Sequence, residues 1–174
     1  AAPMANGRAL NLDFETGTLN DWTATGDAFE LVKTESQTGT RSGHAGTYWI
    51  SSAVGGSARK GSLSSVQLHH AGSRAETALV GAPVAPSAVP DRGVRYAVSF
   101  DDEAPQIVTL VPQGYQAQNR NPAWEKSVGD NAHYGRSKHA AMQPGYHTLK
   151  VWMVDPAVVM QKAVVVLPQQ RGGL

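Results

Sequence analysis

The sequence predicts an all-β fold in which two sheets form a sandwich. Short segments of alternating apolar and polar residues recur between turn residues, which is the pattern of strands buried on one face. The 174 residues include 18 glycines and 10 prolines, and 17% of the residues are charged, a composition typical of strand-and-turn proteins. Helical periodicity is almost absent, so we expect about nine or ten short strands around one core.

The first half of the chain contains the weaker strand patterns. Leu10, Leu12 and Phe14 alternate with polar residues, so a strand at 8–14 would have one apolar face. Gly, Ser and Thr residues make 38–46 a loop. Further strands are expected at 28–33, 47–52, 61–68 and 76–80.

The second half of the chain alternates more clearly. Every second residue of 94–100 is large and apolar, and 106–111 returns after an acidic turn, which predicts a β-hairpin. Both faces of 146–154 become apolar toward its end, so we expect a central strand with Trp152 in the core. The remaining elements expected are a helical turn at 122–128, which begins with Pro122, and a last strand at 158–167.

We predict one β-sandwich domain over residues 1–174. The segment 82–90 contains three prolines and is expected to be an extended connector, or alternatively an edge strand. Each half of the chain would expose one apolar face of its strands if it folded alone. The two segments beside the connector are therefore expected to share one core.

Charge and cysteine content exclude several classes of protein. Fifteen basic and fourteen acidic residues leave a net charge of +1, which argues against nucleic-acid and membrane partners. The absence of cysteine excludes disulfides, thiolate metal sites and a cysteine nucleophile. The start, Ala1-Ala2-Pro3-Met4, is compatible with the remainder of a cleaved signal peptide.

Three segments of the second half carry a family resemblance. Residues 95–102 read Arg-Tyr-Ala-Val-Ser-Phe-Asp-Asp, 124–128 read Trp-Glu-Lys-Ser-Val, and 146–156 read Tyr-His-Thr-Leu-Lys-Val-Trp-Met-Val-Asp-Pro. In this order they resemble the C-terminal β-sandwich domain of glycoside hydrolase family 115, the xylan α-glucuronidases, over about residues 92–167. The resemblance implies a jelly-roll accessory domain without catalysis, because the active site of that family rests chiefly on its preceding domains.

The first half resembles a different kind of module. Residues 12–17 read Leu-Asp-Phe-Glu-Thr-Gly, Trp22 follows, and 43–50 read Gly-His-Ala-Gly-Thr-Tyr-Trp-Ile. Over residues 8–68 this order is similar to the opening of galactose-binding-like carbohydrate-binding modules in secreted proteins. The resemblance implies a galactose-binding-like jelly roll and an extracellular location.

Signatures of an enzyme are missing from the sequence. No Gly-x-Ser-x-Gly nucleophile elbow occurs, and the six histidines lack the spacing of metal ligands. Asp101, Asp102 and Glu103 are consecutive residues of a turn, whereas a glycosidase needs two carboxylates that face each other across the sugar. We therefore expect no catalytic residue, and a cryptic hydrolytic site is the least favoured alternative.

Aromatic residues near the predicted helical turn indicate a sugar site. Trp124 and Tyr115 lie in polar loop sequence with Asn121, and Tyr134 follows shortly after. Aromatic faces stack on sugar rings, while polar groups bind the hydroxyls. We expect these four residues to bind a ligand; alternatively, Trp124 covers an open end of the sandwich.

Structural calcium is a further expectation from the jelly-roll resemblance. Such folds often hold Ca²⁺ between their first and last strands through hard oxygen ligands. Asp13 and Glu15 are two residues apart near the end of the first expected strand, and Asp155 could approach them across the sheet. We therefore expect Asp13, Glu15 and Asp155 to be metal ligands, with the capping of turns as the alternative.

The function expected from the sequence is non-catalytic carbohydrate binding. The expected partner is a polysaccharide or oligosaccharide, such as the plant polysaccharide xylan. The alternative is a secreted structural subunit that assembles into an oligomer or fibre through its strand edges. The apolar residues of 158–167 are compatible with such self-association.

Overall fold

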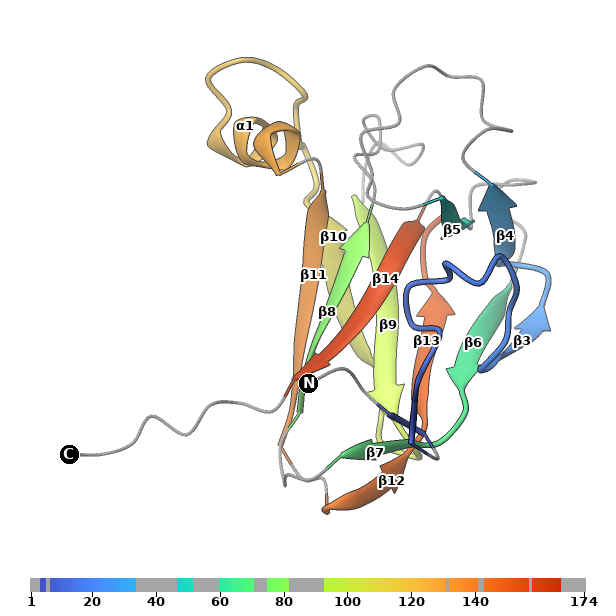
Figure 1. Cartoon of the computed structure of the whole chain (residues 1–174). Coiled ribbons are helices and arrows are strands. Elements are labelled where there is room, and N and C mark those ends of the chain that lie inside the picture. Colours follow the sequence, from blue (N-terminus) through green and yellow to red (C-terminus); the bar gives the residue numbers. More distant parts are fainter. Residues whose placement is uncertain are drawn as a thin grey trace.

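Two five-stranded antiparallel sheets dominate the fold (Figure 1). The computed structural model describes residues 4–5, 7–33, 47–51, 60–70, 75–81, 93–130, 132–140, 143–156 and 158–166, so the predicted connector 82–90 lies outside the described residues. The helix among these residues is not long and apolar enough to span a membrane.

The elements have the following bounds. In the first half they are β1 (Met4–Ala5), β2 (Arg8–Ala9), β3 (Trp22–Gly26), β4 (Glu30–Lys33), β5 (Tyr48–Ser51), β6 (Gly61–Ser65), β7 (Leu68–His70) and β8 (Ala75–Gly81). In the second half they are β9 (Val94–Phe100), β10 (Gln106–Val111), α1 (Pro122–Gly129), β11 (His133–His139), β12 (Gly145–His147), β13 (Leu149–Met153) and β14 (Val159–Val166).

Both large sheets combine strands from the two halves of the chain. The first sheet has the order β10-β9-β13-β6-β3, and the second has the order β11-β8-β14-β5-β4. In the first sheet Val151 of β13 lies opposite Val98 of β9 on one side and Leu63 of β6 on the other. Strand β14 lies between β8, with which it pairs from Met160 to Val166, and β5, with which it pairs at Val159 and Met160.

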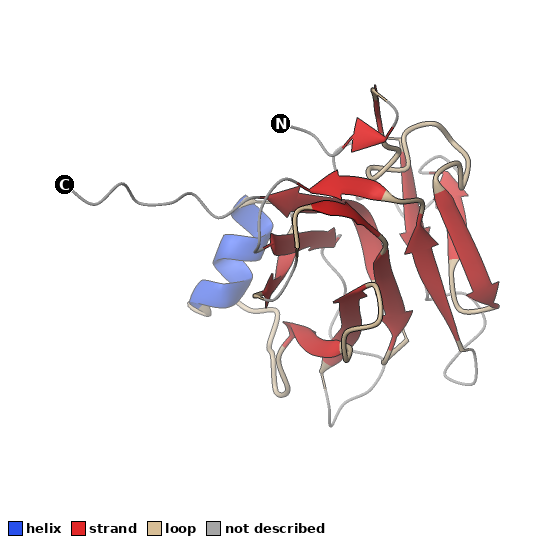
Figure 2. Cartoon of the chain, turned by 90° about the horizontal axis from the view of Figure 1, so that it is seen from below, coloured by secondary structure: helices blue, strands red, loops and turns tan. Residues whose placement is uncertain are grey.

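The core lies between the two sheets. Tyr96, Leu63 and Leu149 of the first sheet are fully buried, as is Ile50 of the second. Figure 2 shows the strands around a common interior, with α1 outside them. The structure therefore confirms a mostly β sandwich with antiparallel sheets. Other buried apolar side chains of the core are Phe14, Trp22, Leu68, Val94, Val98, Phe100, Val151, Met160, Ala163 and Val165.

The expected strand at 8–14 is largely a loop. β2 ends at Ala9, and Phe14 adopts a left-handed conformation with φ of 62°. The Asn11 side chain donates to the Thr18 carbonyl at 3.0 Å, and the Trp22 indole N–H donates to the Asn11 carbonyl at 2.7 Å. The apolar residues of the segment are buried as predicted, but side-chain hydrogen bonds hold this backbone in place of a long strand ladder.

The helix and the hairpin agree with the sequence prediction. α1 begins at Pro122, and Asn121 caps it by accepting the Ala123 N–H at 3.1 Å. β9 and β10 form the predicted antiparallel hairpin. The segment 146–154 differs, because it is divided between β12, which pairs with β7, and β13, which pairs with β6 and β9.

His147 ties β12 to the turn between β9 and β10. Its Nδ1 lies 2.5 Å from Oδ2 of Asp101, and its Nε2 lies 2.6 Å from the Gln143 carbonyl. Both partners only accept hydrogen bonds, so both ring nitrogens must donate and the imidazole is held in its charged form. Burial lowers the pKa of His147, but the hydrogen bonds to Asp101 and Gln143 outweigh it, and the net pKa is raised.

We expect the free energy of unfolding to decrease at alkaline pH through His147. The raised pKa means that this stabilisation is fully present below the ordinary pKa of 6.5 and is lost as the pH rises through the folded-state pKa. His147→Gln should therefore lower the Tm at pH 5.5 and narrow the difference between the Tm at pH 5.5 and pH 8.5. If the Tm difference between pH 5.5 and pH 8.5 were the same in the variant and in the original chain, the assignment of a charged imidazole would be contradicted.

Residues 92–174 are expected not to fold alone. The fragment lacks β6, which pairs with β13, and β8, which separates β11 from β14. We expect an insoluble fragment, or one without a cooperative thermal transition in circular dichroism, while the full chain melts in one transition. A soluble fragment that melts cooperatively would show that 82–90 joins two separate domains.

Candidate functional site

The face of the first sheet that points away from the core is the candidate site. Side chains alternate along a strand, and Val98 and Val151 point into the core, so their neighbours point outward. We call this surface the outer face. The pairing register places on it the side chains of Thr23, Thr25, Ser62, Ser64, Arg95, Ala97, Ser99, Ile107, Thr109, Lys150 and Trp152.

Trp152 is half-buried on the outer face, so the expectation that it lies in the core is wrong. Leu149 and Val151 fill the core from the same strand. Trp152 lies opposite Ala97 on one side and Ser62 on the other, and both of these side chains are small. The indole therefore remains partly exposed and can stack on an apolar ligand surface.

Hydroxyl groups line the outer face on one side of Trp152. Thr25 and Ser62 are opposite each other on β3 and β6, and their hydroxyl oxygens lie 2.7 Å apart. Thr23 and Ser64 form the next pair along the same two strands. Threonine and serine hydroxyls both donate and accept hydrogen bonds, which matches the chemistry of sugar hydroxyls.

Two cationic side chains lie on the other part of the outer face. Arg95 binds Asp155 through two hydrogen bonds, of 2.6 Å from Nε and 3.2 Å from Nη2. Asp155 is fully buried, so this pair is fixed at one end of the sheet. Lys150 lies 3.4 Å from a carboxylate oxygen of Asp102, whose side chain is fully exposed.

The three predicted metal ligands do not come together. Asp155 binds Arg95, and the Glu15 carboxylate accepts the backbone N–H of Thr47 at 2.9 Å. Asp13 accepts the Glu15 N–H at 3.3 Å, as a turn cap does. Within the described part of the chain, no three His, Asp or Glu side chains are grouped so that they could hold a metal ion. We therefore assign no metal to these residues.

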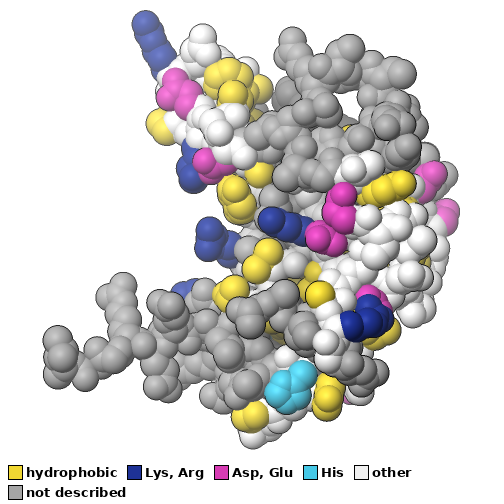
Figure 3. Space-filling view, in the orientation of Figure 1, with side chains coloured by type: hydrophobic (Ala, Val, Ile, Leu, Met, Phe, Trp, Pro, Cys, Tyr) yellow, Lys and Arg dark blue, Asp and Glu magenta, His cyan; other side chains and the backbone are white. Residues whose placement is uncertain are grey.

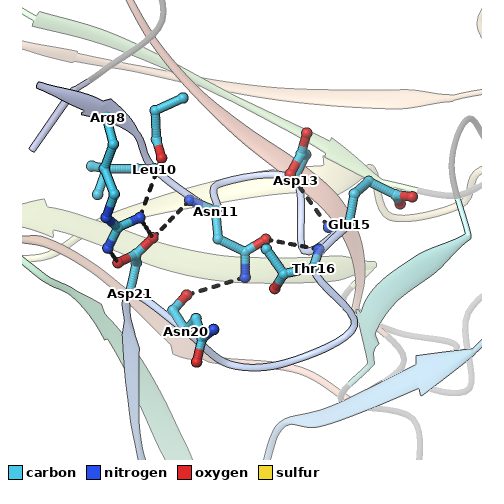
Figure 4. Close-up of a pocket in the computed structure, with 9 residues that line it drawn as sticks. Arg8, Leu10, Asn11, Asp13, Glu15, Thr16, Asn20 and Asp21 are labelled. Carbon is cyan, nitrogen blue, oxygen red and sulfur yellow. Dashed lines mark hydrogen bonds and ion pairs between the residues drawn. The ribbon is translucent and has the colours of Figure 1, made fainter.

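Asp13 and Glu15 instead line an open pocket of about 590 Å³ beside the N-terminal loop (Figure 4). The Arg8 guanidinium points to Asp21 and donates to its Oδ2 at 2.8 Å. This hydrogen bond holds the pKa of Asp21 below its ordinary value. The described residues that line the pocket include no aromatic side chain on which a sugar ring would stack.

Two of the four predicted sugar-binding residues support α1. The Tyr115 hydroxyl lies 3.1 Å from the Ser127 hydroxyl of the helix, and its ring packs edge-on against His133. Asn121 caps the helix and also donates to the Gln116 carbonyl at 2.8 Å. Their polar groups are therefore occupied by contacts within the protein.

The other two predicted residues lie on different elements. Trp124 is a half-buried residue of α1, and Tyr134 is 42% exposed on β11. The Arg136 guanidinium lies 6.0 Å from the centre of the Tyr134 ring, within the range of a cation–π contact. Tyr134 alone of the four combines a well-exposed ring with a nearby charge.

A buried chain of hydrogen bonds has the connectivity of a hydrolase triad. The Ser137 hydroxyl lies 2.8 Å from Nε2 of His139, whose Nδ1 bonds to Glu103. Ser137 also bonds to Thr77. Ser137 is 6% exposed and His139 is 1% exposed, so a substrate cannot reach the hydroxyl. The chain of bonds therefore joins β8 and β11 to the turn after β9 and carries no catalysis.

Charges of both signs are mixed on the surface shown in Figure 3. Asp and Glu side chains lie close to Lys and Arg side chains on the described part of this view. A surface of one sign, which would attract nucleic acid, is not seen in this view. The mixed charges agree with the net charge of +1.

Comparison with solved structures shows the same fold in two proteins. One is TmCBM61, a carbohydrate-binding module solved in complex with β-1,4-galactotriose. Its sequence is 15% identical to this chain, and the two structures match with a TM-score of 0.56. The match covers 90% of this chain and 94% of the TmCBM61 chain. The other is BtGH115A, a family GH115 4-O-methyl-α-glucuronidase with specificity for decorated arabinogalactans, which is 16% identical with a TM-score of 0.51. That match covers 64% of this chain but only 13% of BtGH115A. No curated protein sequence matches the chain.

The family model of the glycosyl hydrolase family 115 C-terminal domain matches residues 28–171. The match confirms the resemblance recognised over 92–167 and extends it to both sides of the segment 82–90. It includes all outer-face residues except Thr23 and Thr25. The chain therefore belongs to the family of glycosyl hydrolase family 115 C-terminal domains.

Proposed function

We propose that this domain is a non-catalytic carbohydrate-binding module and that its outer face binds a polysaccharide. One observation carries the proposal, namely the partly exposed Trp152 between small residues on a sheet face that is rich in hydroxyls. The indole would stack on the apolar face of a pyranose, and the hydroxyls of Thr23 and Ser64 would bind its polar edge.

The ligand is proposed to be a plant polysaccharide. TmCBM61 was solved with a galactose oligosaccharide, and BtGH115A is specific for decorated arabinogalactans. These descriptions support a galactose-containing chain as the first ligand to test, with xylan as the second. A polymer of this kind lies outside the cell that degrades it, so we also propose an extracellular location.

Self-association through a strand edge is the second candidate function. β3 is the edge strand of the first sheet, and its residues from Thr23 to Gly26 are all exposed. None of these four residues is charged, although exposed edges are commonly protected by charges or proline. A second strand could add to this edge, and light scattering after size exclusion would then show an assembly in place of a monomer.

Trp152→Ala is expected to lower the affinity for the bound polysaccharide by at least about tenfold, because the stacking surface is lost. Affinity electrophoresis through gels that contain arabinogalactan, β-1,4-galactan or xylan would measure this. The truncation should cost about 2 kcal/mol of stability, since the side chain is only half-buried, so the variant should still fold.

Trp124→Ala is the matched control, because it removes the same side chain from α1. We expect the polysaccharide in the gel to slow the migration of this variant as much as it slows that of the original chain. Loss of retardation in Trp124→Ala alone would move the site to α1 and β11, where the sequence placed it. Absence of retardation of the original chain in every polysaccharide gel would contradict carbohydrate binding.

A further inference from the structure

The small sheet of β7 and β12 carries a pair of exposed aromatic rings that lie apart from the outer face. The sheet lies at one end of the sandwich (Figure 1). His69 of β7 lies opposite Tyr146 of β12, and the centres of their rings are 5.2 Å apart. Tyr146 is 55% exposed and His69 is also exposed, so both rings face the solvent.

The geometry of this pair leaves ring surface open to a ligand. The planes of the two rings are 74° apart in an edge-to-face contact, so at least one face of each ring is not covered by the other ring. Figure 3 shows a histidine side chain at this end of the molecule, with hydrophobic side chains beside it. A sugar ring can therefore stack on Tyr146 without displacing His69.

The inward side chains of the same two strands hold the pair in place. Leu68 is fully buried in the core and lies opposite His147. His147 is held by the two hydrogen bonds of its ring described above. Because side chains alternate along a strand, His69 and Tyr146 are kept on the outward side. Rings on a backbone that is already fixed lose little conformational freedom when a ligand binds, which favours affinity.

The surroundings of the pair favour a neutral ligand. Residues 61–70 and 143–149, which form and flank the small sheet, include no Lys, Arg, Asp or Glu. The Asp101 carboxylate reaches this sheet from the turn after β9, where it binds the His147 ring and accepts the Thr148 N–H at 2.8 Å. The two segments therefore offer aromatic and hydrogen-bonding groups rather than charge, which suits a neutral sugar.

We propose that Tyr146 and His69 form a second carbohydrate-binding site, which takes one neutral pyranose unit of the polysaccharide. This inference rests on the proposed function, because it adds a site for the same ligand. The Tyr146 ring stacks on the apolar face of the sugar, and its hydroxyl binds a sugar hydroxyl. A neutral imidazole has one nitrogen that donates and one that accepts, so His69 can pair with sugar hydroxyls, which do both.

The second site makes the domain bivalent toward a polymer. Tyr146 and Trp152 are six residues apart along the chain, so their Cα atoms are at most about 20 Å apart. A long polysaccharide can reach both sites, whereas a single sugar unit occupies only one. Binding at one site raises the effective concentration of the polymer at the other, so the polymer is bound more tightly than by either site alone.

Affinity electrophoresis through gels that contain β-1,4-galactan, arabinogalactan or xylan tests the second site. Tyr146→Leu removes the aromatic ring but keeps an apolar side chain, and we expect it to lower the affinity for the polysaccharide that slows the original chain by at least about tenfold. His69→Leu, on the opposite strand, should lower this affinity as well. Tyr146→Phe keeps the stacking ring and should bind more tightly than Tyr146→Leu. Circular dichroism checks that each variant is folded.

Trp152→Ala separates the two sites. This variant keeps the second site, so it should retain weak binding at high polysaccharide concentration, and the double variant Trp152→Ala/Tyr146→Leu should lose that binding. Tyr134→Leu is the matched control, because Tyr134 is a 42% exposed tyrosine of β11 in the other large sheet. It should bind as tightly as the original chain.

The outcomes separate this inference from the proposed function. Unchanged affinity in both Tyr146→Leu and His69→Leu would overturn the second site while carbohydrate binding stands. Complete loss of binding in a folded Trp152→Ala variant, or an equal loss in Tyr134→Leu, would overturn it too. Absence of binding by the original chain in every gel would overturn the proposed function and this inference together.

Discussion

The alternation of side chains along β13 is the constraint on which the core and the candidate site both depend. Leu149 and Val151 are buried between the sheets, and the same periodicity turns Lys150 and Trp152 to the outer face. Pairing with β9 on one side and β6 on the other fixes this register. A slip of one residue would bury a lysine and expose two core residues, so the stability of the sandwich also preserves the outer face.

Hydrogen-bonded polar groups replace apolar packing in two parts of the fold. Asn11 organises the N-terminal loop, and Ser137 and His139 join the second sheet to the turn after β9. Such networks are favourable only when their members find partners, since an unpaired buried polar group is costly. Among the described residues, those with a buried side-chain N or O atom that lacks a partner are Tyr96, Ser99 and Gln161.

The sequence predicted the elements whose buried positions are apolar and missed those whose buried positions are polar. Apolar residues alternate with other residues or follow one another in β9, β10 and β14. The sequence therefore predicted these three strands close to their observed bounds. β11 reads His-Tyr-Gly-Arg-Ser-Lys-His and buries His133, Ser137 and His139, so hydropathy gave no signal for it. The orientation of Trp152 could not be predicted, because both faces of its segment look apolar until the register is known. The pairing of Asp155 with Arg95 joins residues that are 60 positions apart.

An exposed sheet face suits an accessory domain better than an enclosed pocket does. A polymer can lie across such a face at many points along its length, whereas a pocket accepts only a chain end or a short unit. Few contacts then carry the affinity, and they lie on side chains that take no part in the core. Lys150 and Trp152 point outward on β13, whereas Leu149 and Val151 of the same strand fill the core. The packing between the sheets therefore constrains only the inward residues of β13, and its outward residues are free to serve a ligand.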